Sequence, residues 1–161
     1  MSVVQHLLEE LRREAASTRR VMERIPEASL TWKPHAKSMS LGQLALHTAG
    51  LPGGLAVMLN ALEREVPTVP LPEAGSVAEI LAVLEEQAAI AEDRIRSWGD
   101  EGLRETFRWT LQGAVLSETA RLEQVRSVLF NHWYHHRGQL TVYLRLLDVP
   151  LPGIYGPTAD E

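Results

Sequence analysis

Apolar and polar side chains repeat at helical spacing over the first two dozen residues. Charged residues such as Glu9 and Arg13 occupy one part of the helical circumference, as expected for a helix with one buried face. Pro26 ends the pattern, because the residue before a proline avoids helical geometry. We therefore expect a helix from about residue 2 to 24. Its buried face would comprise Val4, Leu7, Leu8, Leu11, Ala15, Thr18 and Met22.

A capping box predicts where the second helix begins. In the segment Ser40-Leu41-Gly42-Gln43, each of the two polar side chains can accept a hydrogen bond from the other residue's backbone N–H. The helix that follows should reach about Arg64. Pro52 lacks a backbone donor and two glycines follow it, so we expect a kink near residue 52.

A second capping box, Ser76 with Glu79, opens a third helix that should end near Trp98. Three prolines and a glycine between residues 67 and 75 make the preceding connection extended. Beyond Trp98 the helical period fades, and aromatic and apolar residues alternate over residues 107–111 as in a short extended segment.

The last helix is predicted from about Ser117 to Leu147. The tail, residues 148–161, holds three prolines and two glycines and cannot continue it. Four helices with short, long and long connections indicate an all-α four-helix bundle in which at least one connection crosses the bundle. A chain of 161 residues, 45% of them hydrophobic, can fill one sizeable core, so we expect a single domain over residues 1–161.

Composition excludes several classes of partner. The formal net charge is −5, from 16 basic and 21 acidic residues, and no basic stripe offers itself to a phosphate backbone, so we expect no nucleic acid partner. No apolar run approaches the roughly 20 residues of a membrane helix, and the first ten residues lack the pattern of a secretion signal. We expect a soluble, cytoplasmic protein without membrane contact. The chain has no cysteine, so any thiol chemistry requires an external thiol.

Three histidines are predicted to meet in the interior. His132 and His136 are one helical turn apart on the apolar side of the last helix, and His47 lies on the apolar side of the second. The alternative is three separate core histidines, but each buried imidazole then needs partners for both nitrogens. A shared metal ion satisfies one nitrogen of each and keeps a fourth coordination position open.

Four further residues flank this group as contacts to the histidines or to a ligand: Gln43, His135, Gln139 and Tyr143. Ordinary packing or solvation is the alternative for each of them. Two other metal templates do not fit, because Trp133 rather than Glu follows His132 and no histidine has Glu three residues before it. Imidazole ligands suit zinc, nickel, copper and iron, so the residues do not select the metal.

An apolar flank of the last helix predicts a homodimer. Trp133, Leu140 and Leu144 lie roughly 80 to 120 degrees from the histidine side and could face a second subunit. The alternative is packing against the first or third helix of the same chain.

The chain resembles the DinB family of metal-binding four-helix bundles, which is related to the bacillithiol and mycothiol transferases. The similarity rests on four stretches that cover the second helix, the last helix and the C-terminus: Trp32-Lys33-Pro34, SMSLGQLALH at 38–47, NHWYHHRGQL at 131–140 and PLPGIYGPTADE at 150–161. The resemblance implies an up-down-down-up bundle, often a homodimer, with a divalent ion such as zinc or nickel held by His47, His132 and His136. It also implies, for several relatives, thiol transfer or isomerisation with a low-molecular-weight thiol.

The leading functional hypothesis is a three-histidine metal protein whose ion acts as a Lewis acid on water or an external thiol. Such a protein would be a metal-dependent hydrolase or a bacillithiol-type transferase with a small-molecule substrate. The sequence assigns no catalytic residue, because no carboxylate lies on either histidine-bearing side. Two alternatives stay open: a non-catalytic, stress-associated dimer that binds a metal or small ligand, and a metal-free helical dimer.

Overall fold

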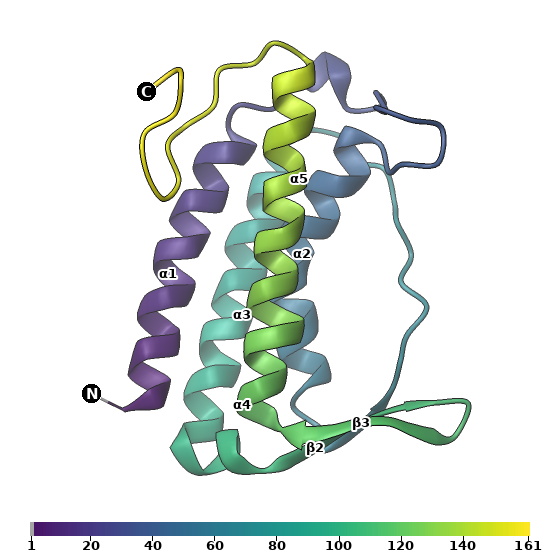
Figure 1. Ribbon diagram of the computed structural model, residues 1–161, viewed down its shortest axis with the longest axis vertical. Coiled ribbons are helices and arrows are strands. Elements are labelled where there is room, and N and C mark those ends of the chain that lie inside the picture. The colour runs from purple at the N-terminus through teal and green to yellow at the C-terminus, as the bar shows by residue number, and fades with distance from the viewer. Residues whose placement is uncertain (1) are drawn as a thin grey trace.

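Long helices pack side by side along the vertical axis of the computed structural model, which describes residues 2–161 (Figure 1). They are α1 (Val3–Met22), α2 (Leu41–Met58), α3 (Val77–Arg104) and α5 (His132–Leu146). A short helix, α4 (Arg121–Gln124), leads into α5, and a 3-10 turn (Glu27–Ser29) lies between α1 and α2. The predicted bundle of helices is therefore confirmed.

The chain rises through α1, descends through α2 and α3, and rises again through α5 (Figure 1). The backbone N–H of Val4 donates to Asp100 Oδ1 at 3.0 Å, so the start of α1 lies beside the end of α3. Near the start of α2, Gly42 lies against Ala74, which directly precedes α3. The connection from residue 66 to residue 75 runs the length of the bundle, along the right-hand side of Figure 1.

A small sheet corrects the expectation of a pure all-α fold. Its strands are β1 (Glu63–Glu65), β2 (Thr106–Leu111) and β3 (Ala114–Ala120), in the order β1-β2-β3. β1 pairs parallel to β2, and β2 pairs antiparallel to β3. Gln112 and Gly113 both have positive φ, the conformation of a two-residue hairpin turn. The extended segment predicted at 107–111 is thus one strand of a hairpin.

The sheet also moves two predicted helix ends. The second helix stops at Met58 rather than near Arg64, because β1 follows within five residues. The last helical segment begins at Arg121 rather than near Ser117, because Ser117 belongs to β3 and pairs with Trp109. The third helix extends beyond its predicted end at Trp98, but Gly99 interrupts it with a φ of 62°.

A π-helical segment, Val125–Asn131, connects α4 to α5. Such a segment carries an i→i+5 hydrogen-bond pattern and so inserts extra chain into a helix without ending it. The two histidines predicted on the last helix come directly after it, with His132 as the first residue of α5.

The apolar flank that suggested a dimer lies in the interior of this chain. Trp133, Leu140 and Leu144 are each 0% exposed. The alternative of packing within the same chain therefore holds, and the inference from this flank to a second subunit was wrong. The homodimer itself stays a prediction.

A buried ion pair joins α1 to α5. Arg137 Nη2 lies 2.7 Å from Glu14 Oε2, and each side chain is 3% exposed. Arg137 also donates to the Glu14 backbone carbonyl at 3.2 Å, and Tyr155 of the C-terminal tail donates to Glu14 Oε2 at 2.8 Å. The two charges are therefore paired and hydrogen-bonded, which a buried charge requires.

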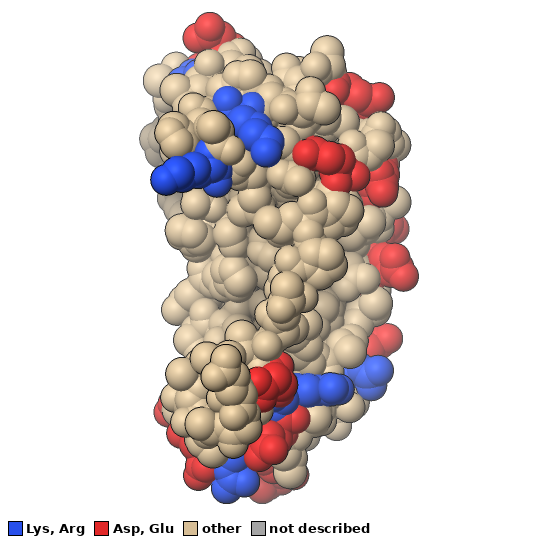
Figure 2. All heavy atoms as spheres, turned by 90° about the vertical axis from the view of Figure 1, so that its right-hand side faces the viewer, with Lys and Arg blue, Asp and Glu red and all other residues tan. Residues whose placement is uncertain are grey.

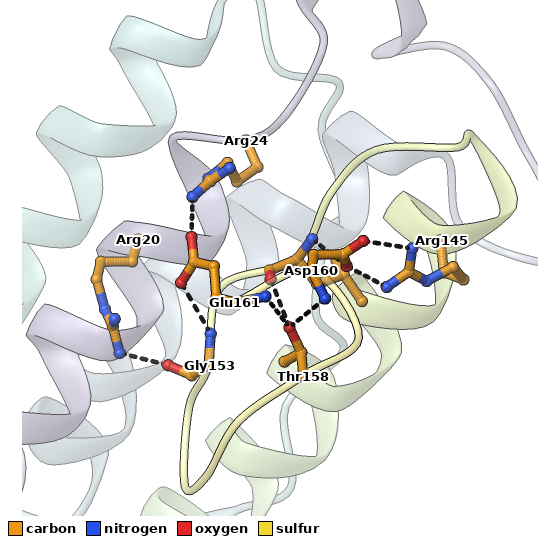
Figure 3. Close-up of polar contacts among 8 residues, drawn as sticks. Arg20, Arg24, Arg145, Gly153, Thr158, Asp160 and Glu161 are labelled. Atoms are coloured by element: carbon orange, nitrogen blue, oxygen red, sulfur yellow. Dashed lines mark hydrogen bonds and ion pairs between the residues drawn. The ribbon is translucent and has the colours of Figure 1, made fainter.

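The C-terminal tail folds back over α1 and α5 (Figure 3). Arg20 donates to the Gly153 carbonyl at 2.6 Å, and Arg24 donates to Glu161 Oε1 at 2.5 Å. On the other side Arg145 pairs with Asp160. The tail is non-helical, as its prolines and glycines predicted. Among residues 2–161 we find no helix with the length and apolar character to cross a membrane.

Replacing Arg137 with Met should lower the free energy of unfolding by about 3–5 kcal/mol, because the buried Glu14 loses its buried partner and keeps only the exposed Arg13 at 3.5 Å. Urea denaturation followed by circular dichroism measures the change. Arg12→Met is the matched control, because Arg12 pairs with Glu92 at the exposed surface and its loss should leave stability near the wild-type value. Equal stability of the two variants would contradict this interpretation.

Gly53 and Gly54 should respond in opposite directions to alanine. A Cβ on Gly53 would lie 2.7 Å from the backbone oxygen of Gln87 and 2.9 Å from its Cα, so α2 and α3 would separate. Gly53→Ala should destabilise the fold by about 1–3 kcal/mol. A Cβ on Gly54 meets nothing within 4 Å, so Gly54→Ala should stabilise α2 by about 0.5–1 kcal/mol. Thermal melts of both variants test the pair.

Candidate metal centre

α2 positions the first histidine through its capped start. Ser40 Oγ accepts the Gln43 backbone N–H at 3.0 Å, and Gln43 Oε1 accepts the Ser40 backbone N–H at 3.0 Å, as the predicted capping box requires. The helix then continues through Pro52 to Met58. His47 lies two turns after the cap and is half-buried, on the side of α2 that faces α5.

The structure brings the three predicted histidines together. Their ring centroids are 4.7 Å apart for His47 and His136, 5.8 Å for His47 and His132, and 4.7 Å for His132 and His136. One ring nitrogen from each lies within 4.8 Å of the other two. Neutral imidazoles are ligands for zinc, nickel, copper and iron, so this group can hold one metal ion.

Gln139 fixes the orientation of one imidazole. Its Oε1 lies 2.7 Å from His136 Nδ1, and an amide oxygen only accepts, so Nδ1 carries the proton. The lone pair of His136 is then on Nε2, which lies 2.8 Å from Nε2 of His132. Metal-binding histidines characteristically donate their other nitrogen in this way, which orients the ring. The donor set therefore fits a metal ion.

Burial keeps the three imidazoles neutral. It lowers the pKa of His47 and of His132 below the usual value, and neighbouring histidines add to this effect. For His136 burial lowers the pKa to about 4, although the hydrogen bond with Gln139 acts in the opposite direction. Because a proton and a metal ion compete for the same lone pair, neutral imidazoles at neutral pH are ready to bind the ion.

The other predicted flanking residues lie in different places. Gln43 is occupied by the capping box and donates from Nε2 to the Leu71 carbonyl at 2.9 Å. Tyr143 lies near the Met39 carbonyl at 3.3 Å and makes an edge contact with the Trp32 ring. His135 is exposed, although its ring centroid is 4.9 Å from that of His136.

A cavity of about 490 Å³ opens beside the histidines. His47 and His132 line it, and the remaining walls come from α2, from the connection after β1, from the sheet and from the π-helical segment. Those residues are Leu46, Gly50, Leu51, Gly54, Leu55, Met58, Val66, Pro67, Val69, Pro70, Pro72, Trp109, Leu116 and Val128. Figure 2 shows this side of the molecule hollowed at mid-height, with charged residues above and below the hollow and acidic residues along the right-hand edge.

Two features of the cavity were not predicted from the sequence. The strap, which we define as residues 66–72, covers one side of it. Trp109 of β2 forms another wall, and its indole N–H donates to Gln124 Oε1 at 2.9 Å. The prolines of the strap predict only a linker, and the alternation around Trp109 predicts only an extended segment. Neither signal points to a cavity before α2 and β2 are placed in space.

Comparison with known proteins gives a consistent family and fold. A family model described as DinB family matches residues 1–161. An uncharacterized protein of Bacillus subtilis (strain 168), YrdA, is 27% identical over 158 residues, which cover 97% of this chain and 90% of YrdA.

Two crystal structures share the fold. A DinB-like protein from Bacillus cereus ATCC 10987 superposes with a TM-score of 0.76 at 22% identity, covering 96% of this chain and 98% of that one. The DinB-like protein YjoA of Bacillus subtilis superposes with a TM-score of 0.72 at 16% identity, covering 95% and 99%. At these identities the likeness concerns the fold.

Replacing His132 with Ala should remove most of the metal from the protein, because two imidazoles hold an ion much less tightly than three. Elemental analysis of untagged protein, dialysed without chelator, should give about one equivalent for the wild type. His135→Ala is the matched control, because His135 is exposed on the same helix and should leave the metal content unchanged. A wild type that contains no metal and takes up neither zinc nor nickel would refute the site.

Proposed function

The chain belongs to the DinB family, and on that premise we propose that His47, His132 and His136 bind one divalent metal ion, zinc or nickel, in a metal-dependent transferase or hydrolase. One observation carries this proposal: two of the three histidines also line the 490 Å³ cavity. A substrate in the cavity would therefore reach the metal site directly. A metal that served only the fold would need no such opening, since structural sites are usually closed by four protein ligands.

The reaction that fits best is transfer of an external thiol to an electrophile. The S–H bond of the thiol and the bond between carbon and leaving group both break, a C–S bond forms, and the proton departs with the leaving group. A bound divalent ion supplies Lewis acidity, which lowers the pKa of a thiol or of water. With water in place of the thiol, the same exchange is a hydrolysis. The thiol must come from outside, because the chain contains no cysteine.

The residues of the chain would hold the metal ion and orient its ligands, rather than transfer protons. Gln139 keeps the His136 lone pair on Nε2, and burial keeps the imidazoles neutral. Among the described residues that line the cavity there is no carboxylate, and its two histidines are the proposed metal ligands, so no further side chain there offers a general base. The apolar walls exclude water from around the reacting group, which strengthens electrostatic interactions with it.

A direct test compares metal-loaded protein with chelator-treated protein in a panel of thiols, bacillithiol included, with chlorodinitrobenzene as a chromogenic electrophile. The wild type should turn over with at least one thiol, and chelation should abolish turnover. His132→Ala should be inactive, whereas His135→Ala should match the wild type. Turnover that survives both chelation and His132→Ala would refute the role of the metal.

A second function is favoured by the origin of the ligands on two helices. His47 comes from α2, and His132 and His136 come from α5, so a bound ion would join these helices and stabilise the fold by linkage. In a non-catalytic metal-binding protein, chelation lowers the melting temperature while every thiol and water assay stays at background. Metal-dependent turnover eliminates this second function.

A further inference from the structure

The cavity beside the histidines combines apolar walls with a single polar end. Among the described residues that line it, the side chains with an available nitrogen or oxygen atom are those of His47 and His132. Trp109 also lines it, but its indole N–H is already donated to Gln124. We propose that the substrate is an uncharged, mainly hydrocarbon molecule that carries one reactive group at the end facing the histidines. This inference rests on the proposed function for the reactive end, and on the cavity alone for the hydrocarbon body.

The lack of charged side chains in the cavity lining argues against a charged substrate. None of the described residues that line the cavity is Lys, Arg, Asp or Glu. The middle of this face carries no blue or red side chains in Figure 2. A phosphate, a nucleotide or a sugar acid would lose hydration in the cavity and find no charged side chain along the walls to compensate for the loss, which carries a large free-energy penalty. The volume of about 490 Å³ is within the range that small organic ligands fill.

The strap makes the wall opposite the bundle apolar along its length. Val66, Val69 and three prolines contribute to the lining. Proline has no backbone N–H, so these positions present fewer backbone donors to a ligand. Hydrogen bonds hold both ends of the strap: Val66 N–H donates to the Thr110 carbonyl at 2.8 Å, and the Leu71 carbonyl accepts from Gln43. The capping residue of α2 thus also positions a wall of the cavity.

A homologous series of ligands measures how much of the ligand's hydrocarbon chain is in contact with the apolar walls of the cavity. Each methylene that moves from water into the cavity should tighten binding about fourfold. Straight-chain alcohols from butanol to octanol form such a series, because only their apolar length changes. They can be titrated as competitors of the uncharged fluorescent probe N-phenylnaphthylamine, whose emission rises in apolar surroundings.

The discriminating variant is Gly54→Leu. Gly54 lines the cavity, and a Cβ there meets nothing within 4 Å, so the new side chain has room to begin and extends into the cavity. The matched control is Gly138→Leu, because Gly138 is also helical and its Cβ is equally unobstructed, but it does not line this cavity. Leucine is a better helix former than glycine in both positions, so both variants should fold.

The wild type and Gly138→Leu should bind the probe, and octanol should displace it at least 50-fold more strongly than butanol. Gly54→Leu should weaken probe binding at least tenfold. Two results would overturn the proposal: equal probe binding by both variants, or an alcohol series whose affinity does not depend on length.

Elemental analysis of the same samples distinguishes failure of the proposed metal function from failure of the proposed substrate class. Absent metal with intact probe binding refutes the metal function only, whereas bound metal without probe binding refutes the substrate class only.

Discussion

The orientation of α5 depends on the buried ion pair between Arg137 and Glu14. Successive residues of a helix point about 100° apart, so a helix with Arg137 directed at α1 has its neighbour His136 directed elsewhere around the axis. In this fold that direction is toward α2, where His47 lies. The pair has two fully enclosed charges on two helices, and any rotation of α5 would separate them. An interaction on one side of α5 therefore fixes the ligand geometry on the other.

The helices and the histidine cluster could be predicted because their signals are local. Periodicity identified α1, and a capping box marked the start of α2. Ser76 caps α3 as predicted, but Glu79 accepts from the Gly75 backbone N–H, so the second capping box is only half formed. The spacing of His132 and His136 placed both imidazoles on one side of a helix. The hairpin was missed for a physical reason. Much of β3 is exposed and its turn is Gln-Gly, so neither a buried alternation nor a common Asn-Gly or Asp-Gly turn marked it.

Tertiary placement decided what the remaining site residues do. Gln43 and Tyr143 have the right helical spacing to face the histidines, but each side chain instead donates a hydrogen bond to a backbone carbonyl. Gln139 has the same spacing and does reach His136, because no competing partner intervenes. The cavity could not be predicted at all, since its walls combine α2, the strap and β2, which are distant in sequence and meet only in the folded chain.

The π-helical segment ahead of His132 bears on how such sites are recognised among distant relatives. A π-helical turn holds about one residue more than an α-helical turn, so a relative that lacks one residue between Val125 and Asn131 and winds as a regular α-helix there keeps the later residues facing nearly the same way. In such a relative His132 and His136 would still face His47. The histidine motif is thus a better guide to the centre than its distance from the hairpin, because the winding of this segment can absorb a difference of one residue.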